Sequence, residues 1–453
     1  MSYQVCAEHK PTRWHEVGSI PAGWEARRLK FVATCNDETL HEGTDPDFEI
    51  AYVDISSVDL INGITAMDML TFEQAPSRAR RVVKDGDTLI SSVRTYLKAI
   101  APVNEPPVNM IVSTGFAVVR PLSFIDSGFL GYALQNAGFI DAVVANSTGV
   151  SYPAINPTAL ICLRIAYPTD KKEQQKIAAF LDWKTGQIDA LIAKKKELMG
   201  KLKEKRQAVI TQAVTKGLDT SAPMRDSGVP WLGQVPVHWE VKPLRRVVSN
   251  MEQGWSPECE NIAASVEDWG VVKAGCCNGG VFDPEENKTL PFDLLPPKNL
   301  EICAGDLLMS RANGSEDFIG SVALVPANTR PKLILSDKIY RLRYEGNVLP
   351  EFLAHTLQSP LTRFQILAAI SGASGLARNI AQSDVKNFLL PMPPLDEQRS
   401  IANHLNIALE KLMAMQLKIE SAITHLTEYR TALITAATTG KIDIRQVAIP
   451  AIT

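Results

Sequence analysis

Residues 171–192 read KKEQQKIAAFLDWKTGQIDALI, and residues 396–419 read DEQRSIANHLNIALEKLMAMQLKI. Both stretches carry a Glu-Gln pair, at Glu173 and at Glu397, followed by Ile, Ala and Leu at the same spacing, and a proline stands shortly before each. Apolar residues recur with helical spacing in both, and neither contains an internal proline, which is typical of a long amphipathic helix. The sequence therefore contains the same helix start twice.

The similarity between the two halves extends well beyond these helices. GSIPAGWEARRLKFV from Gly18 matches GQVPVHWEVKPLRRV from Gly233, and FLGYALQ from Phe129 matches FLAHTLQ from Phe352. Further matched pairs are Trp24 with Trp239, Asp87 with Asp306, and Gly149 with Gly372. The pairs keep the same order and their separation grows gradually, as duplication followed by small insertions produces. The chain is thus a globular part followed by a long helix, present twice.

The helices carry heptad spacing, which predicts a coiled coil. One seam is formed by Leu181, Ile188, Lys195, Leu202 and Val209 in the first copy and by Leu405, Leu412, Ile419, Leu426 and Leu433 in the second. The other seam of the second copy takes Ile401, Ala408, Met415, Ala422, Tyr429 and Ala436. A charged side chain such as Lys195 at a seam position fixes register at some cost in stability.

Each helix is expected to end at a glycine, Gly217 or Gly440. About 40 residues at ~1.5 Å each span roughly 60 Å, which is more than one domain needs to close its core. The two helices most simply pair with each other in antiparallel fashion, with the globular parts at opposite ends and a pseudo-two-fold axis between them.

The globular parts mix strands and helices. Short apolar runs such as TLISSV, MIVSTGFAVV and KIYRLRY lie between Gly, Pro and Asn turns and predict strands, whereas residues 128–144 and 350–370 have helical periodicity. The expected fold class is α+β. The expected boundaries are 1–167 and 221–392 for the two globular domains and 168–220 and 393–445 for the helical spacers.

The composition is that of an ordinary globular protein. The net charge is -3 over 453 residues, and no apolar run reaches membrane-spanning length. The first residues lack the apolar stretch of a secretory signal, so we expect a cytoplasmic protein that contacts no membrane. Seven cysteines without zinc spacing predict neither a metal site nor a disulfide framework, and the adjacent Cys276 and Cys277 are interpreted as thiols without a role.

Motifs for catalysis are missing from the sequence. There is no phosphate-binding loop, no dinucleotide fingerprint, no H-E-x-x-H motif and no evident pairing of histidine with a nucleophile. Asp47 and Glu49 in PDFEI resemble part of a nuclease core but lack its lysine, and NPT at Asn156 lacks the second proline and the aromatic residue of an amino-methyltransferase motif. We therefore expect no catalysis and no cofactor bound by this chain.

The order of segments resembles the specificity subunit of type I restriction-modification systems. The similar segments are GWEARRLKFV, DGDTLISS, STGVSYPAI, the helix start at Glu173, GWSPE, AGDLLMSR, ISGASG and PLDEQRSIANHL, and they cover nearly the whole chain. The resemblance implies two target-recognition domains, each reading one half of a split double-stranded DNA site. It also implies two methyltransferase subunits docked on the helices and motor-nuclease subunits that join through them. S-adenosylmethionine, ATP and Mg would be bound by those partners.

Candidate base-reading residues lie in loops that differ between the two copies. A protein reads DNA bases with Arg, Lys, Asn or Gln side chains at a groove edge. It is positioned on the duplex by hydroxyls or backbone amides that contact phosphates. One loop offers Ser92, Arg94, Thr95, Tyr96 and Lys98, and its counterpart offers Arg311, Asn313 and Ser315. Arg94 aligns with Asn313, as expected if the copies read different bases, and a solvated loop is the alternative.

Two further loops carry candidate DNA contacts. The first is the glycine-containing pair of loops with Thr148, Gly149, Ser151 and Tyr152 in one copy and Ser371, Ser374, Arg378 and Asn379 in the other. Small residues there let the backbone approach a phosphate, and a plain turn is the alternative. The second is QGWSPE, where Trp255 and Ser256 follow a strand, although Trp255 is equally compatible with a core position.

Charge is distributed unevenly between the helices. Residues 171–216 hold twelve Lys or Arg and five Asp or Glu, whereas residues 396–441 hold five of each. The basic run 194–206 is interpreted as a solvated helix face rather than a DNA contact. The near-neutral total leaves open a coiled-coil scaffold that binds only proteins, and a specificity subunit of a related system with a combined methyltransferase-nuclease is a third reading.

Overall fold

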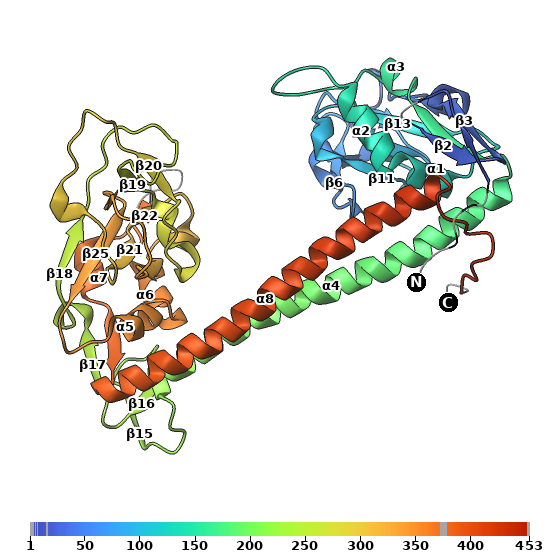
Figure 1. Cartoon of the computed structure of the whole chain (residues 1–453). Helices are drawn as coiled ribbons and strands as arrows, with labels where there is room; N and C mark the ends of the chain where they lie inside the picture. Colours follow the sequence, from blue (N-terminus) through green and yellow to red (C-terminus); the bar gives the residue numbers. More distant parts are fainter. Residues whose placement is uncertain (1–3, 5, 7, 15–16, 372–377, 451–453) are drawn as a thin grey trace. The chain divides into compact units, whose positions relative to one another are not determined.

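The computed structural model describes residues 4, 6, 8–14, 17–371 and 378–450. It divides into two compact units, one formed by residues 1–196 and 420–453 and the other by residues 197–419 (Figure 1). Each unit therefore contains one globular part and half of each long helix. The sequence predicted four segments, two globular domains and two helical spacers. The compact units instead divide each long helix between them, so the four-segment division stays a prediction.

The first unit is built on two four-stranded sheets. One has the antiparallel order β11 (Ile100–Pro102), β10 (Thr88–Ser91), β13 (Phe116–Pro121) and β4 (Ala33–Cys35). The other has the order β8 (Asp68–Thr71), β5 (Glu49–Val53), β12 (Met110–Ser113) and β9 (Ala79–Val82), in which β5 and β12 are parallel. Strand pairs complete the unit: β1 (His9–Pro11) with β2 (Ser19–Pro21), β3 (Trp24–Arg28) with β14 (Arg164–Pro168), and β6 (Val58–Asp59) with β7 (Gly63–Ile64).

The second unit repeats this plan. Its four-stranded sheet has the order β18 (Val248–Gln253), β25 (Ile339–Tyr344), β21 (Leu307–Ser310) and β23 (Val322–Leu324), and a three-stranded sheet has the order β20 (Asn287–Thr289), β19 (Gly270–Val272) and β24 (Leu333–Ile334). Its strand pairs are β15 (Met224–Asp226) with β16 (Gln234–Pro236), β17 (Glu240–Pro243) with β27 (Leu389–Met392), and β22 (Ala312–Asn313) with β26 (Arg378–Asn379). The fold is therefore α+β with an internal repeat, as the sequence predicted.

The central strand of each main sheet is buried on both faces. In β10, Ile90 packs toward the helices while Leu89 packs between the two sheets. In β21, Met309 likewise packs in the core that contains the helices, and Leu308 packs in the core between the two sheets. Alternate side chains of a strand point to opposite faces, so the adjacent apolar residues Leu89 and Ile90 fill the space on both sides of β10.

Short helices cover the sheets. They are α1 (Ser127–Leu134), α2 (Ala137–Ala145) and α3 (Pro157–Leu160) in the first unit and α5 (Pro350–Leu357), α6 (Pro360–Ala369) and α7 (Gln382–Lys386) in the second. Residues 128–144, expected as one helix, are broken because the Asn136 side chain caps α2 by accepting from the Phe139 amide at 2.8 Å. Asn156 likewise caps α3.

The two long helices are α4 (Lys171–Lys216) and α8 (Leu395–Thr438). Gly217 (φ +73°) and Gly440 (φ +71°) follow their ends in the left-handed conformation, as predicted. In the first unit, Leu181 and Ile188 of α4 share a core with Leu433 of α8. In the second unit, the opposite ends of the helices share a core that includes Leu405. In each unit the half of α4 and the half of α8 that it contains thus pack against each other in antiparallel fashion.

The heptad assignment is only partly correct. Leu181, Ile188, Leu405, Leu412, Ile419 and Leu433 are buried, and Lys195, Leu202, Val209 and Leu426 are half-buried. In the other seam Met415 and Tyr429 are 53% and 48% exposed, so these two assignments were wrong, whereas Ile401 of that seam is buried. Among the described residues, no helix combines the length and apolar character that crossing a bilayer requires. Cys276 and Cys277 are buried in a core of the second unit, with their sulfur atoms 3.7 Å apart.

Candidate nucleic-acid interface

The loop after β10 has an unusual backbone. A short 3-10 helix, Thr95–Leu97, is flanked by Arg94 (φ +49°) and Lys98 (φ +55°), both in the left-handed region that ordinary residues seldom adopt. Such conformations cost about 1–3 kcal/mol each and tend to occur at functional sites. The loop thereby presents Arg94, Tyr96 and Lys98 as exposed side chains.

The loop around Gly149 lies directly against this one. Val93 and Thr148 each form a β-bridge with Ala154. The Arg94 guanidinium carbon lies 4.8 Å from the centre of the Tyr152 ring, a cation–π arrangement. Gly149 has φ +110°, which only glycine adopts readily. Two sequence-predicted loops therefore form one surface in the first unit.

Not every predicted residue of this surface is available to a ligand. Ser92 and Thr95 are buried, and their hydroxyls bond to the Gly115 carbonyl and to the Ser147 hydroxyl at 2.8 Å. They hold the two loops in place. Thr148, Ser151 and Tyr152 are exposed.

The second unit brings its predicted loops together in a similar way. Strands β22 and β26 pair so that Asn313 lies opposite Arg378, and Ser371 forms a bridge with Asn379. The Arg378 guanidinium forms an ion pair with Glu316. Ser374 and Gly372 lie outside the described residues.

Arg311 and Ser256 meet at Asp337. The Ser256 hydroxyl donates to the Asp337 carboxylate at 2.5 Å, and Arg311 donates to the Asp337 carbonyl at 3.4 Å. Burial opposes ionisation of Asp337, but hydrogen bonds from Ser256 and Lys338 hold the pKa of its carboxyl below the usual value. The charge of Arg311 lowers the pKa of the Asp337 carboxyl further.

Trp255 is mainly an anchor. Its half-buried ring packs on a core that contains Val271, Leu290 and Ile334, and its amide donates to the Leu335 carbonyl at 2.9 Å. Gly254 beside it has no room for a side chain, because an added Cβ would lie 1.9 Å from that carbonyl oxygen. Ser315 donates its amide to the Asn313 side chain at 3.3 Å and so shapes the neighbouring loop.

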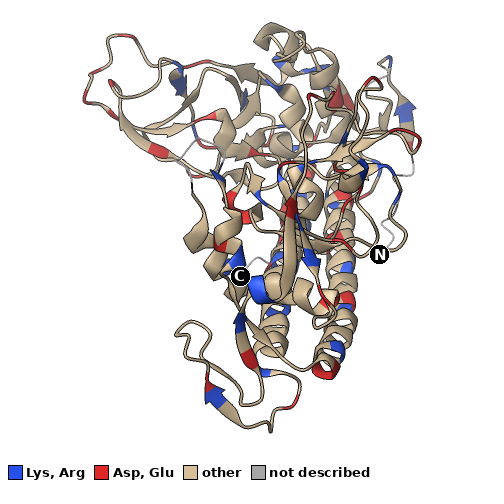
Figure 2. Ribbon diagram, turned by 90° about the vertical axis from the view of Figure 1, so that its left-hand side faces the viewer, with Lys and Arg blue, Asp and Glu red and all other residues tan. Residues whose placement is uncertain are grey.

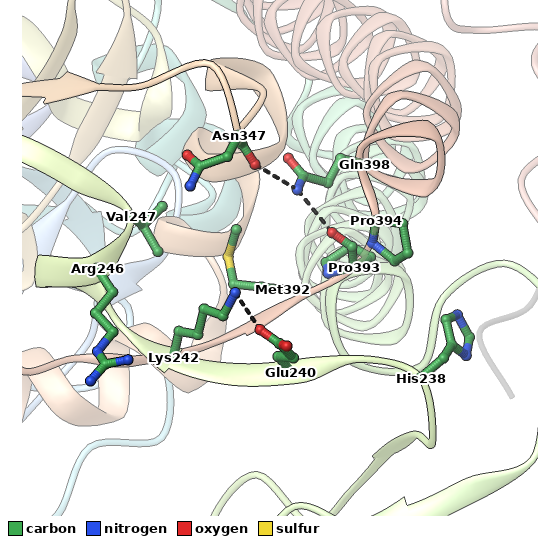
Figure 3. A pocket seen from close by; sticks show the side chains of 10 residues that line it. All are labelled: His238, Glu240, Lys242, Arg246, Val247, Asn347, Met392, Pro393, Pro394 and Gln398. Carbon is green, nitrogen blue, oxygen red and sulfur yellow. Dashed lines mark hydrogen bonds and ion pairs between the residues drawn. The ribbon is translucent and has the colours of Figure 1, made fainter.

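The sequence did not indicate what the repeated Glu-Gln pair does. The buried Gln398 side chain accepts from the Leu349 amide at 2.8 Å and donates to the Pro393 carbonyl at 2.9 Å and the Asn347 carbonyl at 3.5 Å (Figure 3). In the first unit, Gln174 accepts from the Asp126 amide at 2.7 Å and donates to the Pro168 carbonyl at 2.9 Å. These glutamines fix each helix start to its globular part.

A depression beside Gln398 is lined by charged side chains, two of which neutralise each other. Figure 3 shows Glu240, Lys242 and Arg246 along its lower wall. The Lys242 ammonium forms an ion pair with Glu240. The described residues also contain no group of His, Cys, Asp and Glu arranged to hold a metal ion. Figure 2 shows basic and acidic residues along both long helices.

Buried charge networks brace both main sheets. Asp87 accepts two hydrogen bonds from the Arg120 guanidinium at 2.8 Å. Its counterpart Asp306 accepts from Arg341 and Arg343 at 3.0 Å. The sequence match of Asp87 with Asp306 thus reflects a shared framework beneath the variable loops.

The chain is similar in sequence and in fold to proteins that are already known. Residues 299–425 match the family model described as Type I restriction modification DNA specificity domain. The EcoEI type I restriction enzyme specificity subunit of Escherichia coli is 27% identical over 240 residues, which cover 50% of this chain and 40% of that protein. The chain therefore spans less than half the length of that relative.

Two other comparisons cover more of the chain. The EcoKI type I restriction enzyme specificity subunit of Escherichia coli K12 is 23% identical, over 72% of this chain and 68% of its own. A solved structure concerning complex assembly and conformational transition of the type I R-M system has 22% identity and a TM-score of 0.70, and it covers 93% of this chain and 99% of its own. At this level of identity the structural likeness shows the fold.

Proposed function

Because the chain belongs to the family of type I restriction-modification specificity subunits, we propose that it recognises a double-stranded DNA target in two parts, one read by each unit. The observation that carries the proposal is the repeated pairing of two loops with different side chains. Arg94 and Tyr152 meet in one unit, whereas Asn313 and Arg378 meet in the other. A common framework with divergent polar tips suits two readers of different sequences.

The reading groups differ in what they offer to bases. Arg94 and Lys98 supply exposed positive donors, and Tyr96 and Tyr152 supply exposed aromatic surface. In the second unit Asn313, Arg378 and Asn379 are half-buried. Asparagine and arginine form bidentate contacts with adenine and guanine respectively, and each such contact contributes about 1–3 kcal/mol of discrimination.

The long helices are proposed to set the gap and to bind partners. In the second unit Ile407, Met415 and Leu417 of α8 are each 53–56% exposed. Apolar side chains at this exposure on one helix favour a protein partner. The partners are proposed to be two methyltransferase subunits, with motor-nuclease subunits joining through them. This chain is then a non-catalytic recognition subunit, and S-adenosylmethionine, ATP and Mg are bound by the partners.

The test begins with the target. Sequencing methylated motifs in the host genome identifies the two half-sites and the gap. Binding of the assembled complex to that duplex is then measured over a range of salt concentrations. Specific binding that weakens steeply with salt supports DNA reading, because protein cations displace counterions from phosphates. Binding without salt dependence or sequence preference would instead favour a scaffold that contacts proteins alone.

Independent reading is tested by single substitutions. Arg94→Ala is expected to relax specificity in one half-site and Asn313→Ala in the other, each by about 1–3 kcal/mol against single-base variants. Arg399→Ala, an exposed arginine at the start of α8, is the control and should change neither. Exchanging residues 20–160 for those of another family member should change one half-site and spare the other, and loss of both would contradict independent reading. A related system with a combined methyltransferase-nuclease partner would be revealed by the neighbouring genes.

A further inference from the structure

Arg206 of α4 is a half-buried arginine whose charge is not neutralised within its unit. Its guanidinium has no hydrogen bond or ion pair with the residues that the structure describes. Burial lowers the pKa of Arg206, and no charged group among those residues counteracts that effect. A partly desolvated guanidinium without an anion is unfavourable, which makes this position unusual.

The repeat shows what a neutralised arginine looks like at the same position. By the alignment of the Glu-Gln pairs, Arg206 of α4 corresponds to Arg430 of α8. Arg430 is 8% exposed and donates to the Asp189 carboxylate at 3.0 Å. The residue that corresponds to Asp189 is Met413. The second unit therefore keeps the arginine and lacks its acid.

Arg206 lines a cavity of 220 Å³ together with Arg363, Gln358 and Ser321. Arg363 donates to the carbonyls of Ile319 and Glu316, at 2.5 and 2.6 Å, so it adds positive charge to the wall while staying fixed. Asp317 also lines the cavity, and its charge raises the pKa of Arg363. At this cavity Arg206 therefore lacks, among the described residues, the acidic partner that Asp189 supplies to Arg430.

The cavity adjoins the candidate reading strand of the same unit. Asn278, next to the cavity residue Gly279, accepts from the Asn313 side chain at 3.5 Å. Glu316, whose carbonyl holds Arg363, pairs with Arg378 of β26. Lys203 and Lys205 stand beside Arg206 in the sequence and are exposed. An anion bound here would lie close to a segment proposed to read bases.

We propose that this cavity binds one backbone phosphate of the DNA next to the half-site read by the second unit, with the Arg206 guanidinium as its main donor. A guanidinium fork matches a phosphate through two parallel hydrogen bonds, which a lysine ammonium does not reproduce. The inference rests on the proposed function and adds a positioning contact to it. The rival occupant is a carboxylate of a partner subunit, and the test separates the two.

The experiment measures how the affinity of the assembled complex for its target depends on salt, for the wild type and for a set of variants. Arg206→Met is expected to lower affinity about tenfold on target and on mismatched duplexes alike, and to reduce the salt slope by about one. Arg206→Lys should keep the slope and lose part of the affinity. Met413→Asp supplies the acid found in the other unit, so it should raise the melting temperature and reduce the slope as Arg206→Met does.

Two controls come from the chain itself. Lys201→Met removes an exposed charge of the same helix that already pairs with Glu197, and Arg430→Met removes the neutralised counterpart. Both should leave the salt slope unchanged, although Arg430→Met should lower the melting temperature.

The outcomes separate the two proposals. If the wild-type complex shows no salt-dependent specific binding, the proposed function itself fails. If the wild type binds specifically and neither Arg206→Met nor Met413→Asp changes the salt slope, the phosphate site is refuted. Release of a partner subunit from Arg206→Met, with an unchanged slope for the complexes that remain, would show a carboxylate ligand and would also overturn the phosphate assignment. Met413→Asp keeps the test valid even if Arg206→Met fails to fold.

Discussion

Trp239 donates its indole N–H to the Glu397 carboxylate at 2.9 Å and so ties the strand pair at the base of the second unit to the first turn of α8. Trp24 makes the same bond to Glu173 at 3.1 Å in the first unit. Both rings are almost fully buried. The same joint therefore connects helix and globular part in both copies, and the glutamine that follows each glutamate completes it.

Replacing Gln398 by Met should destabilise the second unit by about 3 kcal/mol, because the Leu349 amide and the Pro393 carbonyl would both lose a buried partner. Gln174→Met should have a similar effect on the first unit. Gln187→Met, at an exposed position of α4, is the control. Chemical denaturation checks the prediction, and equal stability of the Gln398 and Gln187 variants would contradict it.

Replacing Gly254 by Ala should cost about 2–3 kcal/mol, because the new Cβ would overlap the backbone of Leu335 and the strand would have to move. Gly314→Ala is the matched control, since no atom lies within 4 Å of the position that its new Cβ would occupy. Thermal unfolding distinguishes the two variants. An unchanged melting temperature for Gly254→Ala would show that the close approach is not required.

Lys98→Gly should raise stability by up to about 1 kcal/mol, because glycine adopts a positive φ without steric cost. The same change should weaken DNA binding, since the ammonium is lost. Lys98→Ala provides the comparison, because it removes the charge and keeps the strain. Only the glycine variant should be more stable than the wild type, as measured by denaturation, and equal stabilities of the two variants would argue against stored strain.

Stability below neutral pH should depend on His355. Burial lowers the pKa of His355, and the nearby Arg206 lowers it further, while the hydrogen bond to Asn406 and the charge of Glu351 act in the opposite direction. The folded state therefore binds the proton less readily than the unfolded chain does. The stabilisation is complete at pH values above the pKa of His355 in the unfolded chain, and it is lost as the pH falls toward the lower pKa of His355 in the folded state. His355→Gln should lose less stability between pH 7 and pH 5 than the wild type. Parallel pH profiles from urea denaturation would disprove this.

The architecture could be predicted from the sequence because the duplication left matched residues where each long helix meets its globular part. The helix starts, the terminal glycines and the strand runs followed from spacing and residue type alone. Met415 and Tyr429 were assigned to the second seam wrongly because a strict seven-residue repeat was extended through α8. A helix has 3.6 residues per turn, so a buried stripe drifts from such a repeat unless the pair supercoils, and Ile423 packs against the core while Tyr429 is exposed.

The candidate site was only partly accessible to sequence reasoning. Loop positions could be located, but whether a hydroxyl points outward depends on contacts distant in sequence, and Ser92 is turned inward by its bond to Gly115. Arg206 was read as part of a solvated basic run. Arg206 lines a cavity with residues such as Phe318 and Ile366, which lie more than a hundred positions further along the chain. Periodicity within one helix carries no information about such neighbours.

The division of each long helix between the two units has a consequence for synthesis. The core of the first unit includes Leu433, Ile434 and Ala437, which the ribosome adds only after residues 197–419. At about 5–20 residues per second, the apolar surface of the first globular part waits for roughly 10–45 s before its covering helix emerges. During that interval the nascent first domain is a natural client for chaperones, and any premature stop within the second unit would leave it permanently uncovered.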